Sequence, residues 1–210
     1  MVPWPSKWRI ALPGAWCRLR SDKWPVCTAA LAVLALSSDL AHAEDVAVPI
    51  SLQAPLLARV AAYDGNLTSR AGDHVRVFIV MRAGDPDSER SALQARSALA
   101  DVPAIAGLEH EQTIVPFSSA SDLVKLCREK HATILYFMPG LSDRIEAIAR
   151  SLVNVSVLTA AAVGSDAPRG IVVGFDLVSG KTTLLINLRQ ARQQNVNLSS
   201  GVLHLATVYQ

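Results

Sequence analysis

Residues near the carboxyl terminus have the types and spacing that could bind a nucleoside triphosphate. The stretch 179–183, Ser-Gly-Lys-Thr-Thr, resembles the end of a P-loop, which requires a glycine, four further residues and then Gly-Lys-Ser/Thr. Backbone N–H groups of such a loop surround the phosphates, and the helix that follows adds its dipole. The upstream glycine, Gly174, is separated from Gly180 by five residues rather than four. The spacing therefore does not fit.

The segments on both sides of this stretch favour strands rather than a loop and a helix. Residues 171–178 and 182–186 are rich in β-branched and apolar side chains. Two such runs around Ser179-Gly180 predict a β-hairpin, with Gly180 able to adopt the positive φ that a tight turn needs. We therefore predict no nucleotide site and no ATPase activity.

Other residues that could carry chemistry are scattered rather than clustered. No two of the histidines lie at a spacing typical of a metal site, and Ser142 lacks the second glycine of a nucleophile elbow. Neither 64–66 nor 85–87 continues into a calcium loop, so both read as turns. The sequence predicts no catalytic residue, metal or cofactor, and an enzyme with an unrecognised hydrolytic site is the least favoured hypothesis. The histidines considered are His74, His110, His131 and His204.

The first 43 residues have the organisation of a secretory signal peptide. A basic leader precedes an uncharged apolar run, 24–38, and Ala41-His42-Ala43 provides small residues before a cut ahead of Glu44. The apolar run is shorter than the roughly 20 residues that span a bilayer, so an uncleaved anchor is the less favoured alternative. We expect residues 44–210 to form one exported, periplasmic domain.

Removal of this leader would change the composition of the chain. All four tryptophans and two of the three cysteines lie in it. Cys127 then remains alone and cannot form an internal disulfide, and its apolar neighbours predict a buried, unreactive side chain. Five of the 20 basic and two of the 18 acidic residues also leave, so the remainder is close to neutral. Nothing in this balance indicates nucleic-acid binding.

The hydrophobic pattern predicts alternating helices and strands. Near-continuous apolar runs at 75–81 and 132–138 are typical of strands buried on both faces. The fold class is α/β: a single domain with a mostly parallel sheet flanked by helices, plus an antiparallel hairpin and two terminal helices near the carboxyl terminus. Further helices are predicted over 51–63, 85–100, 119–130 and from Ser142, its N-cap, to 152, and further strands over 112–117 and 155–159.

Capping signals define the two terminal helices. Asn187 can accept a hydrogen bond from the N–H of Gln190, whose side chain can reach back to form a capping box. Asn197 precedes the last predicted helix, in which four apolar residues would share one face. These are Leu198, Val202, Leu205 and Tyr209.

The segment 171–208 resembles the end of the YfiR-like family of periplasmic proteins. That family ends with a strand, a Gly-Lys turn, a strand finishing in Ile-Asn, a short helix, a leucine and then Ser-Ser-x-x-Leu-x-Leu-Ala. The pieces ILYFMPG and SVLTAA also resemble the middle strands of the family. The matching positions are Gly180, Lys181, Ile186, Asn187, Ala191, Leu198, Ser199, Ser200, Leu203, Leu205 and Ala206.

The resemblance implies a structural role for these positions and a regulatory function for the protein. Members of the family repress a membrane-bound diguanylate cyclase by holding its periplasmic segment, and paired cysteines form disulfides in those members. This chain departs from them because Cys127 is its one cysteine after residue 43. The implied partner is an inner-membrane signalling protein, and a homodimer is compatible with the resemblance.

A second hypothesis is a periplasmic protein that binds a small solute and feeds a transporter or sensor. In doubly wound α/β folds, ligands bind outside the carboxyl ends of the parallel strands. Here those ends are predicted at 82–84, 139–141 and 160–164. Backbone amides there could hold a small anion, but no residue indicates specificity.

Overall fold

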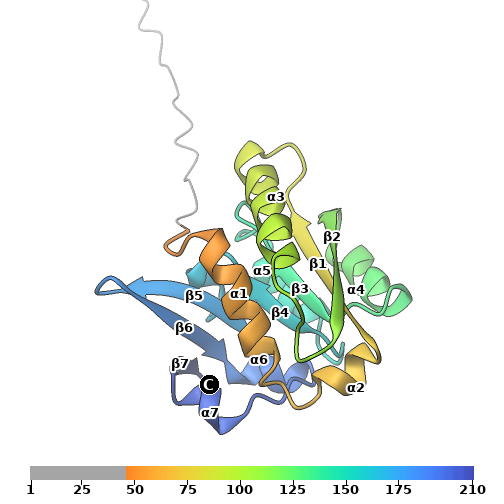
Figure 1. Cartoon of the computed structure of the whole chain (residues 1–210). Coiled ribbons are helices and arrows are strands. Elements are labelled where there is room, and N and C mark those ends of the chain that lie inside the picture. The colour runs from red at the N-terminus through yellow and green to blue at the C-terminus, as the bar shows by residue number, and fades with distance from the viewer. Residues whose placement is uncertain (1–45) are drawn as a thin grey trace, which may run out of the picture. The chain divides into compact units, whose positions relative to one another are not determined.

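The structure, a computed structural model, describes residues 46–210. The predicted signal peptide, with its two cysteines and four tryptophans, lies outside the described residues. The helices are α1 (Ile50–Ala61), α2 (Leu67–Ala71), α3 (Pro86–Ala100), α4 (Ala120–Glu129), α5 (Ile145–Ser151), α6 (Leu188–Gln193) and α7 (Ser200–Leu203). The strands are β1 (His74–Met81), β2 (Glu109–Pro116), β3 (Ile134–Phe137), β4 (Leu158–Ala161), β5 (Val173–Val178), β6 (Lys181–Asn187) and β7 (Ala206–Tyr209) (Figure 1).

A seven-stranded sheet in the order β2-β1-β3-β4-β5-β6-β7 organises the described part of the chain. The first five strands in this order run parallel, β5 and β6 form an antiparallel hairpin, and β7 lies parallel to β6. The predicted mostly parallel sheet with one antiparallel hairpin is confirmed.

Alternating side chains of the central strands belong to two separate hydrophobic cores, one on each face of the sheet. In β1, Val77 and Ile79 belong to one core while Phe78 and Val80 belong to the other. β3 divides in the same way between its odd and even positions. Because successive side chains in a strand point to opposite faces, strands covered on both sides must be apolar throughout. This explains the two continuous apolar runs in the sequence.

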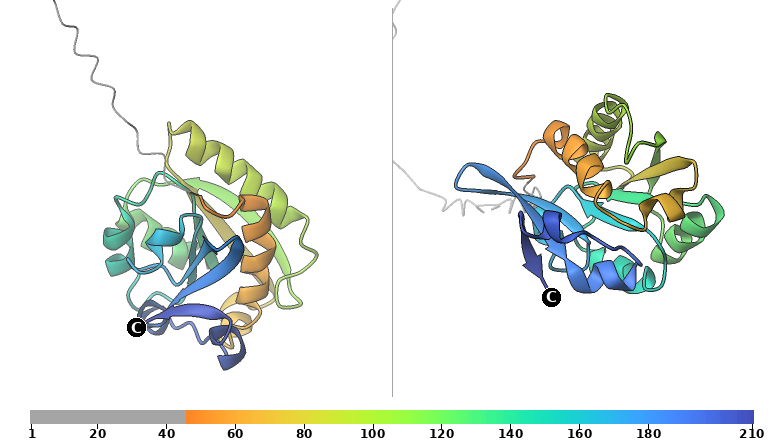
Figure 2. Two further views of the ribbon diagram at one scale, coloured as in Figure 1. Left: turned by 90° about the vertical axis from the view of Figure 1, so that its left-hand side faces the viewer. Right: turned by 60° about the horizontal axis from the view of Figure 1, so that its bottom comes forward.

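Helices cover both faces of the sheet. α1 and α3 pack together on one face, and α4 and α5 on the other, as the two views in Figure 2 show. α3 is capped by Asp85, whose Oδ1 accepts from the N–H groups of Asp87 at 3.0 Å and Ser88 at 3.1 Å. After α3 the chain enters β2, which pairs with β1, and α4 then covers the other face of the sheet before β3.

The β5–β6 hairpin confirms the prediction made for the Ser-Gly-Lys-Thr-Thr stretch. Val178 pairs with Lys181, and the two residues of the turn, Ser179 and Gly180, have φ values of 52° and 76°. Two successive positive φ angles are the requirement of a type I′ hairpin turn. Lys181 begins a strand and not a helix, so the P-loop interpretation is excluded by the backbone.

The carboxyl terminus differs from the sequence prediction. The last helix, α7, spans only Ser200–Leu203, with Ser199 and not Asn197 at its N-cap. The following residues form β7, which pairs Ala206 with Leu184 and Tyr209 with Asn187. The predicted helical face through Leu205 and Tyr209 was therefore wrong, because pairing with β6 satisfies this backbone better than a helix would.

Smaller differences concern the start of α5 and the fourth strand. Ser142 was predicted to cap α5, but the N-cap is Arg144, without a side-chain cap hydrogen bond. The Ser142 hydroxyl instead donates to Oδ2 of the buried Asp166 at 2.9 Å. The strand predicted at 155–159 begins later, at Leu158.

Candidate functional site

The carboxyl ends of β1, β2 and β3 surround a cavity of about 610 Å³, the switch-point pocket. β1 pairs with β2 on one side and with β3 on the other. The order in which the chain adds strands to the sheet therefore reverses at β1. Such switch points are where open α/β sheets bind ligands. The lining residues are Arg82, Ala83, Phe117, Ser118, Ser119, Ala120, Asp143, Arg144 and Ala147.

Two arginines of this pocket share one carboxylate. Arg82 Nη2 lies 2.5 Å from Asp143 Oδ1, and Arg144 Nε lies 3.1 Å from Asp143 Oδ2. All three side chains are between 41% and 59% exposed, so water screens the pairs. The two guanidinium charges are thus partly balanced before any ligand arrives.

The amino terminus of α4 forms another wall of the pocket. The N-cap Ser119 accepts from the N–H of Asp122 at 3.1 Å, and its hydroxyl donates to Asp122 Oδ2 at 2.7 Å. Ser118 donates to the same oxygen at 2.9 Å. These hydrogen bonds, with that from Ser119 the stronger, lower the pKa of the Asp122 carboxyl. The carboxylate of Asp122 therefore already lies at the amino terminus of α4.

A hydrogen-bonded turn between β1 and α3 fixes the position of Arg82. Its N–H donates to the hydroxyl of the buried Ser88 at 2.9 Å, and the N–H of Gly84 donates to Glu89 Oε1 at 2.9 Å. Gly140, with a φ of 91°, follows β3, and a Cβ there would lie 2.5 Å from Asp85 Oδ2. A glycine is required where these two loops meet.

The predicted strand ends fall at the expected edge of the sheet, but only the first lines the pocket. Arg82 and Ala83 line it, whereas Leu141 and residues 160–164 are buried and do not belong to its lining. The sequence analysis predicted only that a helix begins at residue 119, and it considered neither Ser118 nor Asp143 as a site residue. The signals that could have identified them are a polar Ser-Ser pair shortly after β2 and an Asp-Arg pair just before α5.

Several of the positions shared with the family lie in the core. Ile186, Asn187, Ala191 and Leu198 are all buried. Asn187 caps α6 by accepting from the N–H of Gln190 at 3.0 Å, as predicted. The return half of the capping box is absent, since the Gln190 side chain donates to the carbonyl of Ala149 at 3.2 Å. The remaining positions, Gly180, Lys181, Ser199, Ser200, Leu203, Leu205 and Ala206, lie at the surface or are partly buried.

Apolar side chains are exposed where the β5–β6 hairpin extends beyond the helices (Figure 1). Leu177 is 47% exposed, Val178 is 51% exposed and Leu205 is 77% exposed. Leu205 immediately precedes the pairing of Ala206 with Leu184, which places it beside the outer part of the hairpin. We call Leu177, Val178 and Leu205 the hairpin surface.

The histidines considered from the sequence lie on separate elements. Among residues 46–210, no group of three or more histidine, cysteine or acidic side chains could hold a metal ion. His110 contacts the carbonyl of Val102 at 2.7 Å through Nε2, and His204 is exposed at the end of α7. Cys127 is buried. The described helices also include none with the length and apolar character required to cross a bilayer.

The strand order and the switch-point pocket define a doubly wound α/β domain extended by a hairpin and a parallel edge strand. Residues 69–207 match the YfiR/HmsC-like family. The chain therefore belongs to the YfiR/HmsC-like family. Membership supports a regulatory, non-catalytic role in the periplasm. The match begins within α2, so it covers more of the first half than the sequence motifs indicated.

Solved structures show the same fold at low sequence identity. A conserved domain protein from Vibrio cholerae O1 biovar El Tor has a TM-score of 0.55 at 14% identity, with 77% of this chain and 60% of that chain covered. An ABC domain in complex with L-Trp from Streptococcus pneumoniae has a TM-score of 0.53 at 10% identity, with 76% and 61% covered. This chain thus spans about three fifths of each. A comparison with curated protein sequences gave no match.

Proposed function

We propose that residues 44–210 act in the periplasm as a non-catalytic regulator that binds the extracytoplasmic part of an inner-membrane signalling enzyme. The observation that carries this proposal is the family match over residues 69–207. A membrane-bound diguanylate cyclase is the specific partner that we propose, because the resemblance of residues 171–208 points to repressors of such enzymes. Binding would hold the partner's periplasmic segment in one state and so set its activity across the membrane.

The hairpin surface is the part of the chain that we propose for this contact. Its three apolar side chains are exposed although the base of the same hairpin is buried, with Phe175 at 0% and Leu185 at 5% exposure. Because successive residues of a strand point to opposite faces, Leu177 and Val178 expose apolar atoms on both sides of the projecting hairpin, where a partner protein could contact it. The turn that presents them contains Gly180 and Lys181, two of the positions shared with the family.

Site-specific crosslinking tests this proposal directly. A photoreactive amino acid at Val178 is expected to crosslink to an inner-membrane protein in intact cells. The same amino acid at Leu93, which is 54% exposed on α3, provides the matched control and should give no such product. Equal crosslinking from both positions, or none from Val178, would refute the hairpin as the contact.

Partner identity needs a separate measurement. If the captured protein is a diguanylate cyclase, the double substitution Leu177→Ser with Val178→Ser should raise cellular cyclic di-GMP, and Leu93→Ser should leave it unchanged. Capture of a different signalling enzyme would retain the regulatory role and reject the cyclase. Capture of a permease would instead favour the solute-binding hypothesis.

Export can be tested with the intrinsic fluorescence of the protein. Every tryptophan lies within residues 1–24, so protein processed after Ala43 should show tyrosine emission without a tryptophan band. Mass spectrometry of the envelope fraction should place the new amino terminus at Glu44. Persistent tryptophan emission from that fraction would contradict cleavage and support the uncleaved anchor.

A further inference from the structure

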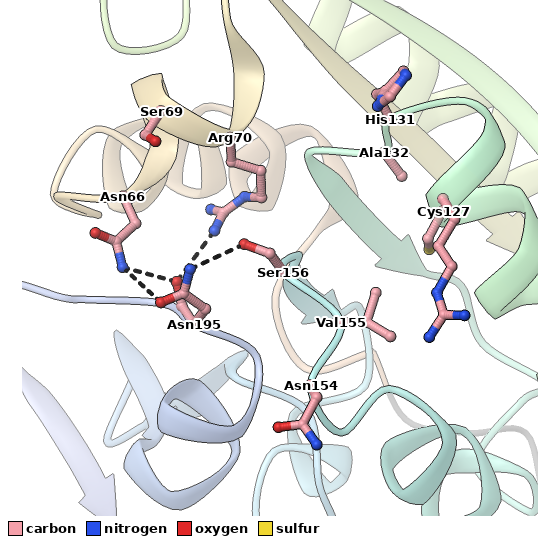
Figure 3. A pocket seen from close by; sticks show the side chains of 11 residues that line it. Asn66, Ser69, Arg70, Cys127, His131, Ala132, Asn154, Val155, Ser156 and Asn195 are labelled. Atoms are coloured by element: carbon pink, nitrogen blue, oxygen red, sulfur yellow. Dashed lines mark hydrogen bonds between the residues drawn. The ribbon is translucent and has the colours of Figure 1, made fainter.

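A second cavity, of about 440 Å³, lies at the opposite ends of the strands, and we call it the amino-end pocket. Its walls come from α2, from the end of α4, from the segment that precedes β4 and from the loop after α6 (Figure 3). These segments are far apart in sequence and meet only in the fold. The volume falls within the range of small-molecule sites.

The lining of this pocket has a single sign of charge. Arg70, Arg128 and His131 contribute cationic or protonatable groups, and none of the 11 lining residues is acidic. Most of the remaining lining consists of amides and hydroxyls. None of the lining residues is Phe, Tyr or Trp, so the stacking platform typical of a sugar or nucleobase site is missing from these walls. The chemistry that remains is recognition of an anion by guanidinium and amide donors.

Arg70 is the buried member of this lining. Its side chain is 5% exposed and forms an ion pair with the fully buried carboxylate of Asp64. Nη1 donates to the carbonyl of Asn195 at 3.4 Å, a long hydrogen bond. Nε has no hydrogen-bond partner among the described residues. Buried polar groups are nearly always paired, so this guanidinium retains donor capacity beside the cavity.

Hydrogen bonds hold the wall around Arg70 in place. Asn66 Nδ2 donates to both oxygens of Asn195, at 3.0 Å to the carbonyl and at 3.1 Å to Oδ1. Asn195 Nδ2 in turn lies 3.3 Å from the hydroxyl of Ser156 (Figure 3). Three segments of the chain are therefore fixed relative to one another before any ligand binds. A preorganised site of this kind loses little freedom on binding.

The backbone around the pocket also adopts an uncommon conformation. His131, Asn154 and Asn195 line the cavity, and each has a positive φ, between 51° and 63°. Each follows the end of a helix, namely α4, α5 and α6. Residues other than glycine in this region are concentrated at functional sites as well as at helix ends. Here all three residues with positive φ contribute to the lining of the same cavity.

We propose that the amino-end pocket binds a small anion that carries carboxylate or phosphate groups. Arg70 forms the inner wall, and Arg128 provides an exposed positive charge at the rim, with the exposed imidazole of His131 also in the lining. Asn66 and Asn195 supply amide groups beside them. The site is separate from the switch-point pocket and from the hairpin surface, and its existence does not depend on the proposed partner. A ligand here would contact both the amino-terminal segment before β1 and the loop after α6.

Isothermal titration of the purified exported protein with citrate, and separately with inorganic phosphate, tests this site. We expect saturable binding of at least one anion at low ionic strength. Arg128→Gln should weaken it by about tenfold, since a charge-assisted hydrogen bond is removed. Arg96→Gln removes the same charge from the exposed surface of α3 and should change the affinity by less than about twofold. Citrate binding alone would assign polycarboxylates, phosphate binding alone would assign phosphates, and binding of both would assign the shared anionic group.

The location of binding requires a residue-specific readout. In two-dimensional NMR, the citrate or phosphate titration should shift the amide signals of Asn66 and Asn195 and leave those of Ser118 and Ser119 unchanged. The opposite pattern would place the anion at the switch-point pocket and overturn the proposal. Absence of saturable binding for both anions, or an equal loss in Arg128→Gln and Arg96→Gln, would also overturn it.

Discussion

The phenol of Tyr136 donates a hydrogen bond of 2.7 Å to Oε1 of Gln53, and both side chains are fully buried. Gln53 Nε2 donates to the carbonyls of Val48 at 2.7 Å and Ala162 at 3.0 Å. One side-chain amide thus connects α1 to β3 and to the residue after β4. Burial raises the pKa of the Tyr136 phenol, which stays neutral and acts as a donor. This contact fixes a helix that lies outside the family match.

Tyr136→Phe should lower the free energy of unfolding by about 1–2 kcal/mol, because Gln53 Oε1 would lose its buried donor. Urea denaturation followed by circular dichroism measures this change. Tyr63→Phe removes a hydroxyl from a residue that is 50% exposed and should alter stability by less than about 0.5 kcal/mol. Equal effects of the two substitutions would show that the buried hydrogen bond contributes nothing of its own.

Arg70→Met should destabilise the fold by about 3–5 kcal/mol, since it leaves the Asp64 carboxylate buried without its cation. The double variant Asp64→Asn with Arg70→Met should recover part of this loss, because the neutral amide can still accept from the N–H groups of Asn66 and Asn197. Arg59→Met, on the exposed side of α1, is the matched control. Denaturation midpoints of the four proteins provide the comparison, and a double variant less stable than Arg70→Met would contradict this account.

Cys127 should react slowly with thiol reagents in the folded protein. Burial raises the pKa of its thiol from 9.0 to about 12, so the reactive thiolate is scarce at pH 8 and increases as the pH rises toward that value. Above pH 9 the unfolded chain would ionise first, so this group opposes folding at alkaline pH. Iodoacetamide labelling followed by mass spectrometry should be at least about a hundredfold slower in native protein than in urea. Comparable rates in both conditions would contradict the buried position.

The hairpin turn offers a test of backbone conformation. Ser179→Asn should raise the free energy of unfolding by a few tenths of a kcal/mol, because asparagine adopts positive φ more readily than serine. Gly180→Ala should lower it by about 1 kcal/mol, although the space around Gly180 is open. Thermal denaturation measures both changes. A stabilising Gly180→Ala would mean that the turn does not hold its φ of 76°.

Local sequence patterns predicted the fold well for the central strands of the sheet and for the β5–β6 hairpin. The apolar runs in β1 and β3 reveal strands covered on both faces, and the turn at Ser179-Gly180 reveals the hairpin. β7 was missed because its four residues directly follow apolar positions at helical spacing, Leu198 and Val202. Thr207 and Val208 carry a β-branched signal, but pairing with β6 decides the outcome.

The candidate sites depended on contacts that no local pattern contains. Arg82 could be placed at a strand end, but its pairing with Asp143, 61 positions away, follows from β3 lying next to β1. In the amino-end pocket, Asn66 and Asn195 are separated by 129 positions. Each asparagine alone reads as an ordinary turn residue. Only the strand order brings them together.

The hydrogen bond from the N–H of Asn197 to Asp64 Oδ1 joins residues 133 positions apart. During synthesis, the segment that contains Asp64 leaves the ribosome long before its partner exists. Loop closure over such a distance is slow relative to helix formation and hairpin zipping. A chain halted before residue 197 would therefore keep the contacts of α1 with α3 but lack the hydrogen bond that holds the last loop on Asp64.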